Sequence, residues 1–278
     1  MSAQVMLLVL LGAALHATWN ALVKSGADKL LDTGLVVAGS ALIAAVALPF
    51  LPQPAPASWP FILASGVIHL GYFSLVAAAY RAGDLSLAYP LMRGTPPLVV
   101  ALVAAALLDE ALRPLGWVGV ALVSSGILAM AVRRGARAHA APIAFALTNA
   151  VVIATYTLVD GIGARRSDAP VAYTLWAFVA TAAFFLPFVA WRRPRALAPH
   201  LVRRWRIGLG AGGCTLGSYA LALWAMTQAP IAAVAALRET SILFGVAIAA
   251  AILRERPTPA RLAGAALIGA GAIALRLA

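Results

Sequence analysis

The chain is a succession of apolar runs, and each run is long enough to cross a lipid bilayer as a helix, which needs about 20 apolar residues. A segment in lipid must satisfy its backbone hydrogen bonds internally, so each run is expected to be α-helical. The predicted spans are residues 3–24, 33–51, 60–81, 85–108, 114–132, 142–163, 170–191, 206–228, 231–253 and 259–277. We therefore predict an all-α membrane protein with ten transmembrane helices.

Composition supports this class. Hydrophobic residues make up 63% of the chain and charged residues 11%, whereas soluble domains have about 25% charged residues. No polar stretch is long enough for a separate soluble domain. The net charge of +12 comes from basic residues in short loops between apolar runs, which is typical of cytoplasmic loops rather than of nucleic-acid binding. The lipid bilayer is therefore an expected partner, and nucleic acid is not.

The chain repeats itself after about 145 residues. A polar motif containing Arg93 is followed by an apolar run that ends at Glu110, and a second motif containing Arg238 is followed by a run that ends at Glu255. Self-similarity at this distance indicates two copies of one unit rather than a solenoid of short repeats.

The predicted units are residues 1–138 and 139–278, each with five spans. Because five is odd, successive units must enter the membrane in opposite senses. We therefore predict two inverted five-helix repeats around a central cavity, with the substrate site near the membrane midplane between them.

Arg93 and Arg238 are the first candidates for that site, since an Arg at the centre of a span costs about 3 kcal/mol on insertion scales. Its planar guanidinium suits a substrate carboxylate. Pairing with an acid and snorkelling to the membrane surface remain alternatives. Glu239 points about 100° around the helix from Arg238, so it is not an obvious local partner. Gly94 and Pro96 could kink the helix beside Arg93.

Two acids are candidates for binding a substrate ammonium, pairing with an Arg or carrying a proton. Asn149, Tyr156 and Asp160 share one face of the sixth span. Asp160 lies near the predicted end of that span and could instead be hydrated at the surface. Glu239 lies deeper, beside Thr240. Tyr156 is a candidate for lining the cavity.

Polar and aromatic side chains that share helix faces are further cavity candidates. They are His16, Trp19 and Asn20 on the first span, His69 and Tyr72 on the third, and Tyr89 on the fourth. Aromatic residues of the membrane interface are the alternative for the rings. The two His could relay protons or simply bond within the helix bundle. No pair has metal-ligand spacing, so neither a metal nor another cofactor is expected.

The fifth and tenth spans are rich in small residues, with Gly119 and Gly126 in one and Gly264 and Gly271 in the other. Small residues let helix backbones approach closely in membranes. We expect these glycines to serve architecture rather than chemistry.

The chain resembles the EamA-type branch of the drug/metabolite transporter superfamily. The resemblance rests on ten spans in a five-plus-five duplication, with an acidic residue at the end of the fourth span and of the ninth. The matching motifs are Leu108-Asp109-Glu110 followed by Gly116-Trp117-Val118-Gly119, and Leu253-Arg254-Glu255 followed by Leu262-Ala263-Gly264. Within that family the chain looks most similar to bacterial YddG-like amino-acid exporters. The resemblance implies a ten-helix basket in the bacterial inner membrane, with a cavity that opens alternately to either side.

Glu110 and Glu255 occupy the acidic position of this family, and the resemblance implies a structural role for them. Each comes just before the next helix, which begins at Pro114 or Pro259. A carboxylate there can accept hydrogen bonds from free N–H groups and favour the positive end of the helix dipole. Direct substrate contact is the alternative.

The distribution of basic residues predicts the orientation. Of the 21 Lys and Arg residues, two are intramembrane, about 15 lie in odd-numbered loops, and about four lie in even-numbered loops and the termini. By the positive-inside rule the odd-numbered loops are cytoplasmic and both termini periplasmic. This departs from the cytoplasmic termini expected for many members of the family.

The leading functional hypothesis is a secondary transporter that exports small metabolites, above all amino acids, by alternating access. The alternative is a proton-coupled exporter of drugs and other cations, which the two intramembrane Arg residues disfavour. The sequence contains no Walker-type loop, HExxH motif or nucleophile elbow, so neither ATP-driven transport nor enzyme activity is expected. Two inverted repeats in one chain remove the need for a dimer, so we expect a monomer, with proton coupling left open.

Overall fold

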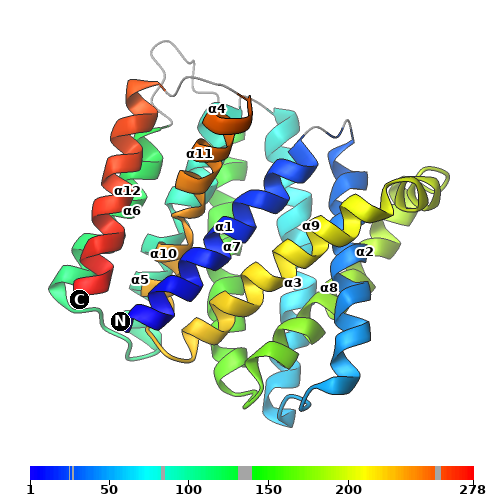
Figure 1. Ribbon diagram of the computed structural model, residues 1–278, viewed down its shortest axis with the longest axis horizontal. Helices are drawn as coiled ribbons and strands as arrows, with labels where there is room; N and C mark the ends of the chain where they lie inside the picture. Colours follow the sequence, from blue (N-terminus) through cyan, green and yellow to red (C-terminus); the bar gives the residue numbers. More distant parts are fainter. Residues whose placement is uncertain (25, 27, 83–84, 131–139, 254–257) are drawn as a thin grey trace.

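The computed structural model describes residues 1–24, 26, 28–82, 85–130, 140–253 and 258–278. Within these residues every regular element is a helix (Figure 1). Nine helical stretches in this part are apolar and long enough to cross a membrane, and Pro114–Ala129 is a shorter apolar helix. The predicted class, an all-α membrane protein, is confirmed.

The helices form two sets in chain order. The first is α1 (Ala3–Lys24), α2 (Lys29–Ala47), α3 (Trp59–Ala82), α4 (Leu85–Gly94), α5 (Pro96–Leu107) and α6 (Pro114–Ala129), with short 3-10 turns at Leu48–Phe50 and Pro56–Ser58. The second is α7 (Ala140–Arg165), α8 (Pro170–Arg192), α9 (Leu197–Met226), α10 (Ile231–Arg238), α11 (Ser241–Leu253) and α12 (Pro259–Leu277). The predicted boundary between residues 138 and 139 lies outside the described residues, as does the predicted turn Gly83-Asp84.

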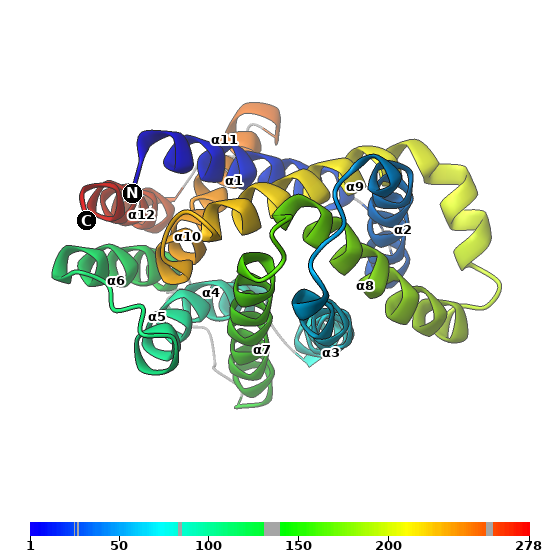
Figure 2. The same cartoon turned by 90° about the horizontal axis from the view of Figure 1, so that it is seen from below.

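The two sets have opposite senses, as the inverted repeat requires. In Figure 1, α1 rises from the lower side of the molecule, while its counterpart α7 descends towards that side. Both termini lie on this lower side. Seen along the helices in Figure 2, α6 and α12 lie at one end and α2, α3 and α8 at the other, with α4, α7 and α10 between them.

The fourth span is divided into α4 and α5 one residue after Arg93, between Gly94 and Pro96. Pro96 and Pro97 have no backbone N–H, so they cannot donate to the carbonyl groups of Met92 and Arg93 four residues earlier. The helix therefore restarts at Pro96, a position where proline is favoured because the first helical N–H has no partner. The kink that Gly94 and Pro96 suggested is present.

The ninth span is divided in the same way directly after Arg238, although no proline is present. The N–H of Glu239 bonds to the carbonyl of Ala236 and the N–H of Thr240 to that of Leu237, each at 3.1 Å. These bonds reach three residues back rather than four, so the chain makes a tight turn between α10 and α11. Each repeat thus has a discontinuous helix whose break follows its intramembrane Arg.

Two helices begin four or more residues earlier than hydropathy predicts. α2 begins at Lys29 because the side chain of Asp28 caps it, accepting bonds from the N–H groups of Leu30 at 3.0 Å and Leu31 at 3.2 Å. α9 begins at Leu197 rather than at residue 206, and it is kinked at Arg204, where φ is −115° and ψ is 19°. Its first turns are too polar to register as a membrane span.

The packing of α6 against α12 explains the glycines of these two helices. A Cβ on Gly264 would lie 2.5 Å from the carbonyl oxygen of Gly126, and one on Gly126 would lie 2.7 Å from that of Gly264. Gly119 and Gly271 face each other in the same manner, with corresponding distances of 3.0 and 2.8 Å. The backbones are in direct contact, which confirms the predicted architectural role.

Candidate functional site

An ion pair joins the two repeats at the helix breaks. The Nε of Arg93, at the end of α4, lies 3.0 Å from Oε2 of Glu239, which follows α10. Both side chains are largely buried, with exposures of 11% and 8%. The two atoms are not aligned for a good hydrogen bond. Of the alternatives open for Arg93, the structure shows pairing with an acid, and that acid belongs to the other repeat.

Arg238 occupies the equivalent position but has a different environment. Its guanidinium carbon lies 4.9 Å from the centre of the Tyr219 ring. Among the described residues no carboxylate forms an ion pair with it. A cation over an aromatic face is stabilised by roughly 0.5–2 kcal/mol, but the planar fork of hydrogen-bond donors remains available to a ligand.

Asp160 is completely buried rather than hydrated at a helix end. Its carboxylate accepts hydrogen bonds from Ser65 and Tyr173, both at 3.0 Å, and from Tyr219 at 2.5 Å. The hydrated alternative is therefore wrong. The reason is that α7 continues to Arg165 and that α3, α8 and α9 each contribute one hydroxyl, which replaces the water that a surface carboxylate would bind.

Four rings form an aromatic cluster beside Asp160, made of His69, Tyr72, Tyr156 and Tyr219. His69 stacks on Tyr156 with ring centres 4.5 Å apart, and Tyr72 meets Tyr156 edge-on at 5.7 Å. Tyr219 meets the His69 ring edge-on at 6.4 Å. Three of these four residues are predicted site residues, and α3, α7 and α9 bring the cluster together.

Tyr219 is the main residue that sequence reasoning missed. It lies under Arg238 and also donates to Asp160, so it connects the two charged groups. One signal was present: in the alignment of the repeats Tyr219 matches Phe73, on the segment that carries His69. Ser65, which bonds both Asp160 and the Nδ1 of His69, was missed as well.

The predicted face of α1 is present, with His16, Trp19 and Asn20 together. The Trp19 indole N–H lies 3.4 Å from Nδ1 of His16, and the Asn20 amide donates to the backbone carbonyl of His16 at 2.9 Å. The charges of Arg93 and Arg238 both act on His16, so His16 lies near these two residues.

Two further predictions concern the ring of Tyr89 and a proton relay between His16 and His69. Tyr89 is within electrostatic range of Arg93 and is 39% exposed. His69 bonds Ser65 of its own helix. No hydrogen bond joins His16 to His69 in the described part of the chain, so a direct relay between these two rings is absent there.

A small cavity lies at the helix breaks, lined by Arg93, Arg238, Glu239, Tyr156 and neighbouring apolar residues. Its volume is about 10 Å³, which is room for roughly one water molecule. This cavity is too small for an organic substrate, which can occupy it only if the surrounding helices separate. Within the described residues no group of three or more His, Cys, Asp or Glu could hold a metal ion.

Glu110 caps a helix, but not the one that follows it. Its Oε2 accepts a 3.0 Å bond from the N–H of Ile231, the first residue of α10, and its other oxygen pairs with Arg165. The predicted cap at Pro114 is wrong. Asp109 adopts a left-handed φ of 56° at the end of α5, and this turn directs the chain so that Glu110 reaches the positive end of α10. Glu255 lies outside the described residues.

Comparisons with known proteins agree with this architecture. The sequence profile of the EamA-like transporter family matches residues 3–132 and 140–277. A solved structure described only as a crystal structure of a protein superposes with a TM-score of 0.77 over 100% of this chain and 98% of that one, at 20% sequence identity. No curated protein matches the chain at a significant level. Because the family profile covers both repeats, the chain belongs to the EamA-like transporter family, whose members are membrane transporters and not enzymes.

Proposed function

We propose that the protein is a secondary transporter that exports amino acids, including aromatic and apolar ones, by alternating access. The observation that carries this proposal is Arg238. It lies at a helix break in the centre of the molecule, and no carboxylate of the described residues pairs with it. A partly buried Arg without an anion suits a substrate that brings one.

The charges at the centre favour a zwitterion. Arg93, Arg238 and Glu239 together carry a net charge of +1, since two cations face one anion. An amino acid can offer its carboxylate to Arg238 and its ammonium to Glu239. The N-terminus of α11, which begins at Ser241, adds the positive end of a helix dipole beside the carboxylate. The aromatic cluster would contact the substrate side chain.

The ion pair between the repeats supports alternating access. Arg93 belongs to one repeat and Glu239 to the other, and the cavity beside them is too small for a substrate. A substrate ammonium that binds Glu239 competes with Arg93, so substrate binding would loosen the contact between the repeats. The displaced Arg93 would share the substrate carboxylate with Arg238, because both line the same cavity. This avoids leaving a buried charge unpaired, which costs about 3–5 kcal/mol.

The rival function, proton-coupled export of cations, is favoured by Asp160. Three hydroxyl groups bond this buried carboxylate, and no cation among the described side chains forms an ion pair with it. It also lies beside aromatic rings, which attract organic cations. In this alternative Asp160 would exchange a proton for a cation.

Uptake into proteoliposomes separates the two functions. We expect wild-type protein to move radiolabelled aromatic amino acids, and Arg238→Ala to reduce uptake at least tenfold, because a charge-assisted hydrogen bond contributes about 1.5–3 kcal/mol. Arg166→Ala, which removes an exposed Arg, is the matched control and should keep wild-type uptake. Transport of organic cations that survives Arg238→Ala but is lost in Asp160→Asn would establish the rival function instead.

We also propose a monomer in a bacterial inner membrane, with both termini periplasmic. The termini lie on the lower side of Figure 1, opposite the Arg-rich connection between α8 and α9. The bias of basic residues supports a cytoplasmic position for that connection. Activity of alkaline phosphatase fused to the C-terminus would support this orientation, and fluorescence of green fluorescent protein fused there would reverse it.

A further inference from the structure

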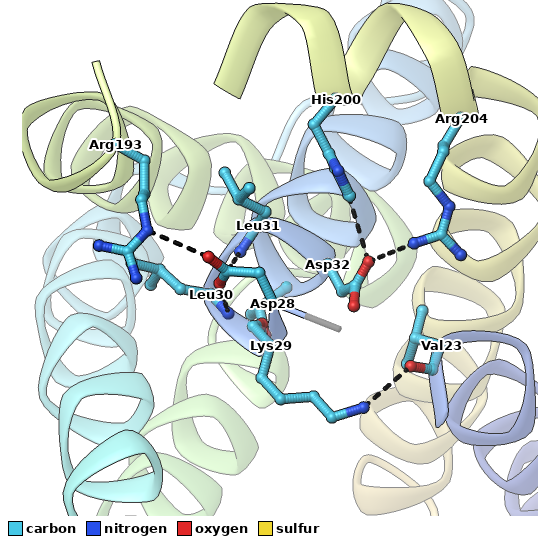
Figure 3. Close-up of polar contacts among 10 residues, drawn as sticks. Val23, Asp28, Lys29, Leu30, Leu31, Asp32, Arg193, His200 and Arg204 are labelled. Carbon is cyan, nitrogen blue, oxygen red and sulfur yellow. Dashed lines mark hydrogen bonds and ion pairs between the residues drawn. The ribbon is translucent and has the colours of Figure 1, made fainter. Parts of the chain in front are cut away.

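The connection between α8 and α9, residues 191–206, is the most basic segment of the chain. We call it the α8–α9 corner. Six of its residues are Arg, and no acidic residue occurs between Asp168 and Glu239. Arg193 pairs with Asp28 at 3.0 Å, and Nη1 of Arg204 lies 2.5 Å from Oδ1 of Asp32 (Figure 3). These two ion pairs attach the corner to the start of α2.

The first turns of α9 lie across the direction of the spans. They are seen nearly end-on at the right of Figure 1 and lengthwise in Figure 2. The change of direction occurs at the kink at Arg204. His200 on these turns lies 3.2 Å from the same Asp32 oxygen that binds Arg204, and Asp32 is almost completely buried. The segment is therefore a helix that is attached to α2 and lies across the spans, the orientation expected of a helix at a membrane surface.

The other four Arg residues of the corner, Arg192, Arg195, Arg203 and Arg206, are exposed. In the part of the chain that the structure describes, no carboxylate forms an ion pair with any of them. Acids of the described residues therefore do not account for these four arginines. Their positive charge is directed outwards.

Large apolar side chains are exposed between these arginines. Trp191, Val202 and Trp205 are 71%, 75% and 54% exposed. The guanidinium of Arg192 lies 4.7 Å from the Trp191 ring centre, and that of Arg206 lies 5.4 Å from the Trp205 ring centre. A shallow hollow that is open to the surroundings is lined by residues 203–207 at the kink. A surface that combines unpaired cations with exposed Trp fits a ligand that is anionic at one end and apolar at the other.

We propose that the α8–α9 corner binds the headgroup of an anionic phospholipid. Arg203 and Arg206 bind the phosphate in the hollow at the kink, and Trp205 and Val202 contact the glycerol and the first part of the acyl chains. A soluble anion would use the arginines but would leave these apolar side chains exposed. Each Arg near an anionic membrane surface strengthens binding about fivefold.

Native mass spectrometry of the purified full-length protein tests this proposal. The detergent-solubilised protein is titrated with phosphatidylglycerol or with phosphatidylcholine of the same acyl chains. We expect tighter binding of phosphatidylglycerol. In Arg203→Gln/Arg206→Gln its affinity should fall about 25-fold, as two fivefold effects combine, and in each single variant about fivefold. Binding of phosphatidylcholine should not change.

The control variant Arg113→Gln/Arg166→Gln removes the same charge from the opposite side of the molecule, where both residues are exposed. It should bind phosphatidylglycerol as the wild type does. Equal binding of both lipids by the wild-type protein would overturn the proposal without any variant. So would equal losses in the two double variants, or displacement of phosphatidylglycerol by millimolar glycerol phosphate, which would indicate a site for a soluble anion.

Discussion

The two intramembrane Arg residues have equivalent positions in the repeats but different partners, and one residue accounts for the difference. In the alignment Arg93-Gly94-Thr95 matches Arg238-Glu239-Thr240, so the first repeat has Gly where the second has Glu. The two helix breaks therefore contribute one acid, Glu239, for two Arg residues. Glu239 pairs with Arg93 of the other repeat. Arg238 has no carboxylate partner among the described residues and lies against the face of the Tyr219 ring.

A double-mutant cycle measures the ion pair. We expect Arg93→Met to destabilise the protein by about 3 kcal/mol, because Glu239 remains buried without a partner. Glu239→Gln alone should have a similar effect through Arg93. The double variant should lose clearly less than the sum of the two in thermal unfolding. Additive losses would mean that the two charges do not stabilise each other.

The contributions of the Tyr219 ring and of its hydroxyl group can be tested separately. Tyr219→Phe keeps the ring under Arg238 but removes one of the three hydrogen bonds to Asp160, which should cost about 1 kcal/mol of stability. Tyr219→Leu removes both contacts and should reduce stability and amino-acid uptake further. If uptake by the Phe and Leu variants is the same, the ring does not position Arg238.

Most charged residues of the centre could be predicted, but Tyr219 could not. Arg and Glu within apolar spans stand out because burying them is expensive. A Tyr in a span is ordinary, and its role depends on Asp160, which is 59 residues away in the chain. No local spacing reveals a partner that a different helix supplies.

At the level of helices, hydropathy predicts which segments span the membrane but not how each is divided. The break after Arg93 could be anticipated because Pro96 lacks an N–H. The break after Arg238 could not, since it is a tight turn without Pro or Gly. The start of α9 was not predicted for a different reason. Hydropathy identifies only the apolar part of a helix, and the first turns of α9 are rich in Arg.

The contact between α6 and α12 can be tested within a single helix. Gly264→Ala places a methyl group 2.5 Å from the carbonyl oxygen of Gly126, and we expect a loss of about 1–3 kcal/mol as the helices separate. A Cβ on Gly269 of the same helix would meet no atom of a neighbouring described residue within 4 Å. Gly269→Ala should therefore be neutral or slightly stabilising, since Ala favours helix. Equal effects on thermal unfolding would contradict close packing at Gly264.

The attachment of α2 to the α8–α9 corner should depend on pH. Burial raises the pKa of Asp28, but hydrogen bonds from Arg193 and from the backbone at Leu31 outweigh it, so the pKa is lowered from 3.8. A lowered pKa stabilises the fold above the unfolded value, and this stabilisation is lost as the pH falls through the folded value.

Asp28→Asn isolates the charge, because Asn is also a good helix cap. At pH 5–7 the wild type should be more stable than this variant by about 0.5 kcal/mol, typical of an exposed ion pair. The difference should disappear as the pH falls below 3.8, the value of an unperturbed Asp. A difference that is constant with pH in thermal unfolding would mean that the charge of Asp28 contributes nothing.

At the level of the whole molecule, the inverted repeats meet at their broken helices, and the polar groups at these breaks lie beside a small cavity of about 10 Å³. Tight backbone contact between α6 and α12 at one end contrasts with the side-chain contacts at the centre, which include the ion pair between Arg93 and Glu239. Opening is therefore expected at the centre, where Arg93 and Glu239 can exchange partners with a substrate.

The most direct test asks whether Arg238 recognises the substrate carboxylate. Uptake of radiolabelled phenylalanine into proteoliposomes is measured in competition with unlabelled phenylalanine or with its carboxamide, which keeps the ammonium and the ring. The wild type should prefer the acid at least tenfold, and Arg238→Gln should lose this preference. A wild type that accepts both competitors equally, or a variant that still prefers the acid to the full extent, would contradict carboxylate binding by Arg238.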